Sequence, residues 1–349
     1  MTIRGSDSER INVTLNGIPL NNPESMGSFF VNLPDFGSST QSIQIQRGIG
    51  TSTNGPAAFG ASLNIQTDLL EKKAYLEFNN SFGSYNSWKN TLKGGSGLIN
   101  NKFAFNARLS RISSDGYVDR ASSDLKSLYV DAGIYTDKHT LKATVFSGKE
   151  KTYQAWYGLA EPLFLQNKER IEDYADNLWL FDGERERFLN GNRKYNYYTY
   201  DNQTDNYTQT HAHLNYSYRP SDKLTLNTAF HYTRGKGYYE EFRPMDGLTH
   251  YGIDTLRLNG EVIKDTDLIR RRWLDNHFYG LTYSLLYKPT HNLNLTFGGA
   301  YNQYKGKHYG EVIWADLIPN DELTGKYYYS HANKNDFNFS SITLGFSPA

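Results

Sequence analysis

From about Lys73 onward, apolar and polar residues alternate with a period of two along most of the chain. In the stretch "KFAFNARLSRI", the apolar face carries Phe103, Phe105, Ala107 and Leu109. Its other face carries Ala104, Asn106, Arg108 and Ser110. Strict alternation indicates β-strands with one apolar and one polar face. The pattern predicts ten strands, at roughly residues 74–83, 86–97, 102–113, 124–136, 139–149, 206–218, 223–235, 275–288, 292–305 and 335–347.

The connections between these strands are of two kinds. The short segments "INN", "DK", "PSD" and "PTHN" alternate with connections that are mostly long, at 113–124, 150–205, 236–274 and 306–334. One end of the sheet therefore carries tight turns and the other carries loops, which is the layout of an outer-membrane barrel. We expect a mainly β fold: a partial antiparallel transmembrane β-barrel of about ten strands, preceded by a small mixed α/β segment.

A soluble β-sandwich is the alternative architecture for such strands. The chain contains 28 Tyr, 19 Phe and 5 Trp, although only 38% of its residues are hydrophobic. Buried sandwich faces are usually rich in Val, Ile and Leu, whereas membrane barrels carry girdles of aromatic residues at both interfaces. The tyrosine content therefore favours the barrel.

Composition and motifs also narrow the function. Lys+Arg and Asp+Glu are equal at 37 each, so no net charge favours a nucleic-acid partner. The absence of cysteine excludes disulfides and thiolate metal sites. No hydrolase, zinc-protease, phosphate-loop or calcium-loop motif occurs, so we expect neither an enzyme nor a cofactor. His211 and His213 share a strand face and could ligate a metal, but polar side chains facing a lumen are the favoured interpretation.

The first 68 residues differ from the rest. "VTLNGIPL" predicts a hairpin, because Asn16-Gly17 can adopt the positive φ values of a type I′ turn. "SIQIQRG" and "ASLNIQT" are predicted strands on either side of a glycine- and alanine-rich stretch. We therefore predict a boundary between residues 1–68 and a barrel segment at 69–349.

These N-terminal motifs resemble those of the TonB-dependent outer-membrane receptors, in the form common in Bacteroidetes. The family's plug domain carries an "IRG" element, a "DG-x-P" hairpin and an "IEVIRGP…YG…GGVINI.T" segment before the first barrel strand. The corresponding residues here are Ile3-Arg4-Gly5, Asn16-Gly17-Ile18-Pro19 and "IQIQRGIGTSTNGPAAFGASLNIQT". The sequence departs from the family at Gln44, Ile49 and "GAS".

The resemblance implies a receptor of the bacterial outer membrane, embedded in its lipid, that captures a scarce ligand. An iron-siderophore or similar chelate is the favoured ligand, imported with energy from a TonB-type coupling protein. It also implies a fragment: the C-terminal part of the plug at 1–68 and the first part of the barrel. A glycan-uptake receptor of the same architecture and a passive porin or adhesin barrel remain alternatives, and a surface lipoprotein partner is left open.

Candidate ligand-binding residues lie in or near the longest predicted loops. Cations there could attract an anionic iron chelate, and aromatic residues at the loop ends could line a vestibule. Solvated loop charge and interfacial aromatic girdle are the alternative interpretations. The candidates are Tyr153, Trp156, Tyr157, Arg185, Arg187, Arg270, Arg271, Arg272 and Trp273.

Two further groups of residues concern how the plug is held. The predicted hinge and packing glycines are Gly48, Gly50, Gly55 and Gly60. A charge that is buried between plug and barrel needs a partner. We therefore predict a latch in which Arg47, or otherwise Arg4, pairs with Glu77 on the lumen face of the first barrel strand.

Overall fold

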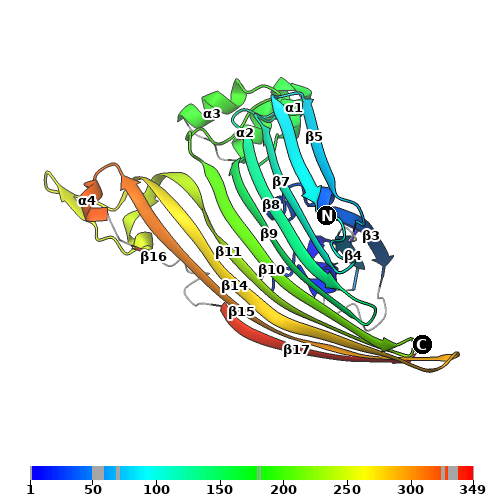
Figure 1. Ribbon diagram of the computed structural model, residues 1–349. Helices are drawn as coiled ribbons and strands as arrows, with labels where there is room; N and C mark the ends of the chain where they lie inside the picture. The colour runs from blue at the N-terminus through cyan, green and yellow to red at the C-terminus, as the bar shows by residue number, and fades with distance from the viewer. Residues whose placement is uncertain are drawn as a thin grey trace.

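The structure, a computed structural model, describes residues 2–48, 59–67, 71–178, 180, 182–323, 327–328 and 337–348. Within them, most of the chain forms one large curved sheet (Figure 1). Its strands are β5 (Tyr75–Gly83), β6 (Ser87–Gly95), β7 (Phe103–Ser114), β8 (Ser123–Tyr135), β9 (His139–Tyr153), β10 (Thr204–Ser221), β11 (Leu224–Gly247), β14 (Asp265–Thr290), β15 (Leu293–Ala315), β16 (Tyr327–Tyr328) and β17 (Phe337–Pro348).

The large sheet is an antiparallel meander. Its strands neighbour one another in the order β16-β15-β14-β11-β10-β9-β8-β7-β6-β5, and β17 also pairs with β15. The short turns after β6, β8, β10 and β14 lie at one end, whereas the helices, the long connections and the short turn between β5 and β6 lie at the other (Figure 1). Among the described residues, β5 pairs with β6 alone and β17 with β15 alone. The predicted meander of ten long strands is confirmed.

One face of the large sheet is apolar and uncovered. On β5, Leu76 is 79% exposed and Phe82 is 82% exposed. The same face continues across the sheet with Phe78, Phe103, Phe105, Leu109, Leu128, Phe230, Tyr283, Tyr287, Phe297, Tyr301, Ile342 and Leu344. A contiguous apolar surface of this extent is the face that a membrane barrel presents to lipid. The strand alternation therefore places Arg108 on the inner face, together with Ala104, Asn106 and Ser110, as predicted.

The small sheet lies against this inner face. Its strands are β1 (Ile11–Leu15), β2 (Ile18–Pro19), β3 (Thr40–Arg47) and β4 (Ala61–Thr67), in the order β2-β1-β4-β3. The predicted hairpin turn is present, with φ of 51° at Asn16 and 82° at Gly17. Short 3-10 turns at Ser8–Arg10, Phe30–Asn32 and Phe36–Ser39 complete the segment.

A single hydrophobic core joins the small sheet to the large one. Phe36 packs on Tyr129 of β8 and Phe146 of β9, with ring centroids 6.3 Å and 5.1 Å away. The remaining members come from the small sheet and are Ile11, Val13, Leu15, Ala61, Leu63 and Ile65. The apolar residues of β1 and β4 are therefore buried against the wall that the larger strands form.

Four strands are longer than predicted, and this corrects the predicted loops. β9 continues to Tyr153, β11 to Gly247 and β15 to Ala315, while β14 begins at Asp265. The connections predicted at 150–205 and 236–274 therefore shrink to 154–203 and 248–264. Because Arg270, Arg271, Arg272 and Trp273 fall inside β14, they are strand residues and not loop residues.

The two long connections fold into small units of their own. Helices α1 (Glu161–Leu165), α2 (Lys168–Asn177) and α3 (Asp182–Leu189) enclose Leu163, Ile171, Ala175 and Phe188. The other unit contains β12 (Leu256–Leu258) and β13 (Glu261–Ile263), together with α4 (Asn320–Leu323) from the connection that follows β15. Leu248, Leu268 and Leu323 are fully buried in it. None of the helices among the described residues combines the length and apolarity that a membrane crossing requires.

Candidate functional site

The contact between the N-terminal segment (residues 2–48 and 59–67) and the large sheet is here called the seam. Its central group is the Asp35 carboxylate, which is 3% exposed and lies 3.2 Å from the guanidinium of Arg108 on β7. Lys89 on β6 lies 2.5 Å from the same carboxylate. Because Arg108 is only 1% exposed, the two opposite charges are buried together.

Hydroxyl groups surround this buried pair. Three of them donate to the Asp35 carboxylate at 2.6–2.7 Å and come from Ser38, Thr91 and Ser110. Arg108 in turn donates to the Ser39 hydroxyl at 2.8 Å and to the Asp35 carbonyl. Burial opposes ionisation of Asp35, but the hydrogen bonds from Lys89 and the hydroxyls outweigh it and hold the Asp35 pKa well below its usual range. Asp35 is therefore an anion at any physiological pH.

A second polar contact of the seam lies toward the long-connection end of β15. The Glu24 carboxylate accepts a hydrogen bond from the Tyr304 hydroxyl and lies 2.8 Å from His308 Nε2. Burial raises the Glu24 pKa, but the hydrogen bonds to His308 and Tyr304 together lower it by more than burial raises it. The Glu24 pKa therefore lies below its usual value. The N-terminal segment thus presents carboxylates to the wall at two separate places.

Further contacts join the segment to strand β9. Lys142 on β9 donates to the Thr67 hydroxyl at 3.1 Å and pairs with Asp131 at 3.0 Å. At Gly148, a Cβ atom would lie 2.1 Å from the Asn32 carbonyl oxygen, so any larger residue would collide with the segment's backbone. The seam therefore combines charge pairing with close steric fit.

The predicted latch residues lie elsewhere, and this corrects the prediction. Arg4, Arg47 and Glu77 are all exposed. Glu77 accepts a hydrogen bond from Asn79, and no ion pair within the described residues joins it to either arginine. Arg47 lies on β3, the edge strand of the small sheet farthest from β1. The buried pair has the opposite polarity, since the carboxylate belongs to the N-terminal segment and the cation to the wall.

Two of the four predicted hinge glycines can be placed. Gly48 has a φ of 76°, and its N–H donates to the Gly60 carbonyl at 2.8 Å. A Cβ atom at Gly60 would lie 2.6 Å from Cβ of Ser6. Gly50 and Gly55 fall outside the described residues. Both placed glycines lie where a side chain would be strained, which fits close packing; their hinge role stays a prediction.

Most of the predicted ligand-binding arginines form ion pairs or hydrogen bonds with other residues of the protein. Arg185 pairs with Asp176, and Arg187 donates to the carbonyls of Asn196 and Tyr197. Their role in the described structure is to hold the 154–203 connection together.

Two of the three predicted arginines of β14 also form ion pairs within the protein. Arg270 pairs with Glu241 and Arg271 with Glu240 at 2.7–2.8 Å. Trp273 donates to Glu311 at 3.1 Å. Arg272 makes no ion pair among the described residues, and its guanidinium lies over the Tyr239 ring at 5.3 Å.

The structure brings several predicted residues together through aromatic rings. The Trp156 ring, 57% exposed, contacts the Tyr239 ring on which Arg272 stacks. Tyr157 is 72% exposed and contacts Tyr197 and Tyr198 at 4.9 Å and 5.5 Å. Tyr153 is buried, and its hydroxyl donates to the Tyr200 carbonyl. The exposed rings of Trp156 and Tyr157 and the half-buried Arg272 thus lie at the long-connection end.

The predicted lumen-facing histidines are buried on the inner face. His211 Nδ1 lies 3.0 Å from the Thr233 hydroxyl, and its ring stacks on Phe146. Among the described residues, no cluster of three or more His, Asp or Glu side chains is arranged to hold a metal ion.

The chain matches no protein-family model and no curated protein. Solved structures do match. The closed form of the ferric-catecholate import receptor Fiu from E. coli K12 is 13% identical with a TM-score of 0.61, over 99% of this chain and 46% of that one. The siderophore receptor PiuA from Acinetobacter baumannii is 13% identical with a TM-score of 0.59, over 99% of this chain and 48% of that one.

The ferric citrate transporter FecA gives a similar result, with 16% identity, a TM-score of 0.54 and coverage of 98% of this chain and 44% of that one. At such identities the comparisons establish the fold. The chain spans about half the length of the receptors it matches. It therefore has the fold of the TonB-dependent outer-membrane receptors.

Proposed function

We propose that the protein is an outer-membrane receptor that captures a scarce metal chelate and imports it with energy from a TonB-type complex. Residues 1–68 act as plug and residues 69–349 as barrel wall. The seam is the observation that carries this proposal. A small sheet is held on the inner face of a wall whose outer face is apolar, by a shared hydrophobic core and by the buried ion pair of Asp35 and Arg108.

The seam also argues against the alternative that the protein is a passive porin or adhesin barrel. A porin or adhesin barrel needs no folded segment inside its lumen. Here the N-terminal segment shares a core with β8 and β9 and makes polar contacts with β6, β7, β9 and β15. This arrangement supports an occluded channel that must be opened.

The favoured ligand is an anionic iron chelate. At the long-connection end, the exposed ring of Trp156 contacts the half-buried ring of Tyr239, over which the guanidinium of Arg272 lies. An anionic ligand would first be bound at this aromatic and cationic surface. The matched structures include a ferric-catecholate import receptor, a siderophore receptor and a ferric citrate transporter, and this supports an iron chelate as the ligand. A glycan would use the same aromatic rings, so glycan uptake by the same architecture is the second candidate.

Growth of a deletion strain tests the proposal. The strain is grown with single sources of iron (ferric citrate or a ferric catecholate), of cobalamin, of haem or of glycan. We expect loss of growth on one iron chelate, restored by the wild-type gene and reduced with Arg272→Ala. Normal growth on every iron chelate, with loss on a glycan alone, would replace the favoured ligand by the second candidate.

A further inference from the structure

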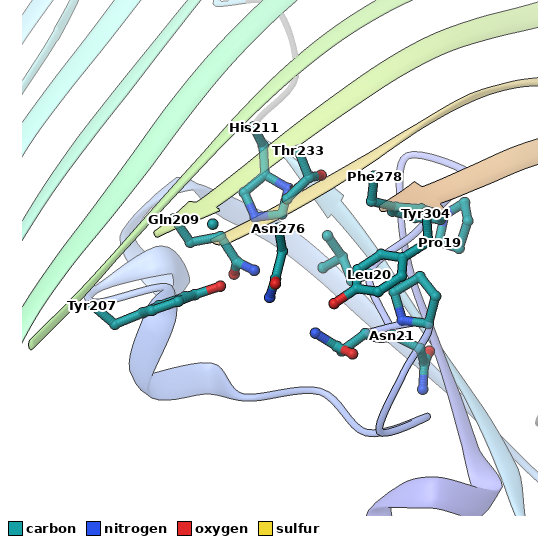
Figure 2. A pocket seen from close by; sticks show the side chains of 13 residues that line it. Pro19, Leu20, Asn21, Tyr207, Gln209, His211, Thr233, Asn276, Phe278 and Tyr304 are labelled. Carbon is teal, nitrogen blue, oxygen red and sulfur yellow. The ribbon is translucent and has the colours of Figure 1, made fainter. Parts of the chain in front are cut away.

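The outer face of β11, β14 and β15 carries a group of charged side chains next to its apolar part. Figure 2 shows Thr233, Asn276 and Tyr304 on the opposite, inner face, next to the N-terminal segment. Because successive side chains of a strand point to opposite faces, the residues that adjoin them in the sequence lie on the outer face. The outer-face group, here called the charged patch, consists of Arg234, Lys236, Asp275, His277, Lys305 and Lys307.

The strand register brings the members of the charged patch side by side. In one row across the three strands, His277 lies between Arg234 and Lys305. In the next row, Asp275 lies between the remaining two lysines. Neighbouring strands are about 4.8 Å apart, so the six side chains cover one continuous area of the outer face.

The charged patch has an excess of positive charge. Its four Lys and Arg side chains face one carboxylate, that of Asp275. Asp275 forms an ion pair with Arg234 and lies 3.8 Å from the Lys236 ammonium group. Lys305 and Lys307 are exposed, and neither forms an ion pair within the described part of the chain. Two ammonium groups on β15 are therefore available to an anion.

The charged patch begins where the apolar outer surface ends. Phe230, Tyr283 and Tyr301 belong to the apolar surface on the same three strands. Arg234 follows Leu224, at the short-turn end of β11, by ten residues. At about 3.3 Å per residue and a strand tilt of about 40°, this is roughly 25 Å of height, which is also the approximate height of the apolar band of a membrane barrel. The patch therefore lies at the level of the lipid headgroups.

We propose that the charged patch binds the phosphate group of an anionic lipid whose acyl chains cover the adjoining apolar surface. Lys305 and Lys307 contact the phosphate, and Lys236 contributes a third positive charge from β11. A soluble anion would gain these charges only, whereas a lipid would also cover the apolar residues beside them. The proposal concerns the lipid-facing surface and goes beyond import, so its failure would leave the growth test on iron chelates unaffected.

The test measures equilibrium binding of radiolabelled lipids to the purified protein in a non-ionic detergent. Dioleoyl phosphatidic acid carries the phosphate, and dioleoyl phosphatidylcholine has the same acyl chains without a net charge. We expect phosphatidic acid to bind more tightly, and its binding to weaken at high salt. The double variant Lys305→Gln, Lys307→Gln should lose about tenfold in affinity. Lys236→Gln, a single exposed substitution, should lose about threefold and carries the test if the double variant does not fold.

The matched control is the double variant Lys168→Gln, Lys194→Gln. It removes two exposed lysines from the 154–203 connection and should bind phosphatidic acid like the wild type. Equal binding of the two lipids, or an equal loss in the control, would overturn the proposal. Inorganic phosphate at the same concentration as the lipid should not compete. If it displaced phosphatidic acid, the patch would be a site for soluble phosphate and the lipid proposal would be wrong.

Discussion

Asp35 illustrates what a single buried charge requires of its surroundings. The residue adopts a φ of 53°, next to Phe36, whose ring enters the shared core. This conformation directs the carboxylate to strands β6 and β7, more than 50 residues away in sequence. The sequence predicts that Arg108 lies on the polar face of its strand, because strand alternation fixes the face of each residue. The sequence does not predict its partner, because the turn at Asp35 and the packing of Phe36 decide which carboxylate forms the ion pair with Arg108.

Removing the Asp35 carboxylate should loosen the seam. Asp35→Ala removes the buried carboxylate that faces the Arg108 guanidinium, and breaking a buried ion pair in this way costs about 3–5 kcal/mol in comparable pairs. We expect a lower thermal unfolding temperature and increased sensitivity of cells to large antibiotics. The matched control is Asp124→Ala, which removes an exposed partner of Arg111 and should change neither measurement. Equal effects of the two variants would show that the buried pair does not hold the segment.

Glu24 should make the seam sensitive to acid. Its folded pKa lies below its usual value of 4.5, so its stabilising contribution is complete above pH 4.5 and is lost as the pH falls through the folded pKa. We expect the unfolding temperature of the wild type to fall more steeply below pH 4.5 than that of Glu24→Gln. Glu172→Gln, on the exposed side of α2, serves as control and should follow the wild type. Parallel curves for the wild type and Glu24→Gln would contradict this role.

At the scale of elements, the strand ends show where alternation stops being informative. The predicted strands 223–235 and 275–288 stop where the apolar face gives way to charged and aromatic residues. In the structure these residues continue the ladder because they pair across strands. Arg271 pairs with Glu240 and stacks on Tyr238, so β11 and β14 extend far beyond their apolar portions. Such pairings depend on register, which a single strand's pattern does not fix.

Glu240 should anchor the 154–203 connection to the wall. Its carboxylate accepts hydrogen bonds from Tyr200 at 2.8 Å, Asn202 at 2.6 Å and Arg271 at 2.7 Å. Glu240→Ala should expose the connection to limited proteolysis while the heat-resistant barrel persists. Asp222→Ala, in the short turn between β10 and β11, is the control. If the digestion pattern of Glu240→Ala matched that of the control, the anchoring role would be wrong.

The steric part of the seam can be tested separately. Gly148→Ala should displace the N-terminal segment, because the added Cβ would meet the Asn32 carbonyl at 2.1 Å. We expect antibiotic sensitivity without loss of the barrel. Gly183→Ala is the matched control, since a Cβ there meets no atom within 4 Å and alanine favours the helix. If the antibiotic sensitivity of Gly148→Ala were unchanged, the N-terminal segment would be able to shift and accommodate the added methyl group without opening the channel.

At the scale of the whole molecule, the meander follows from local information. The alternating period, the sorting of connection lengths and the Asn16-Gly17 hairpin each predicted what the structure contains. The placement of the small sheet was predicted by resemblance only. Its register against β6 to β9 arises from contacts between distant segments, and those contacts carry no local sequence signal.

The unequal strand lengths have a consequence for how solutes reach the opening. β5 has 9 residues and β14 has 26, which at about 3.3 Å per residue corresponds to roughly 30 Å and 85 Å of strand. A hydrocarbon core is about 30 Å thick, so β14 is long enough to project well beyond a bilayer, whereas β5 is not. In the proposed membrane receptor, the part of β14 that carries Arg272 would therefore stand clear of the lipid. The wall would then rise unevenly around the entrance, with the Arg272 side as its taller part.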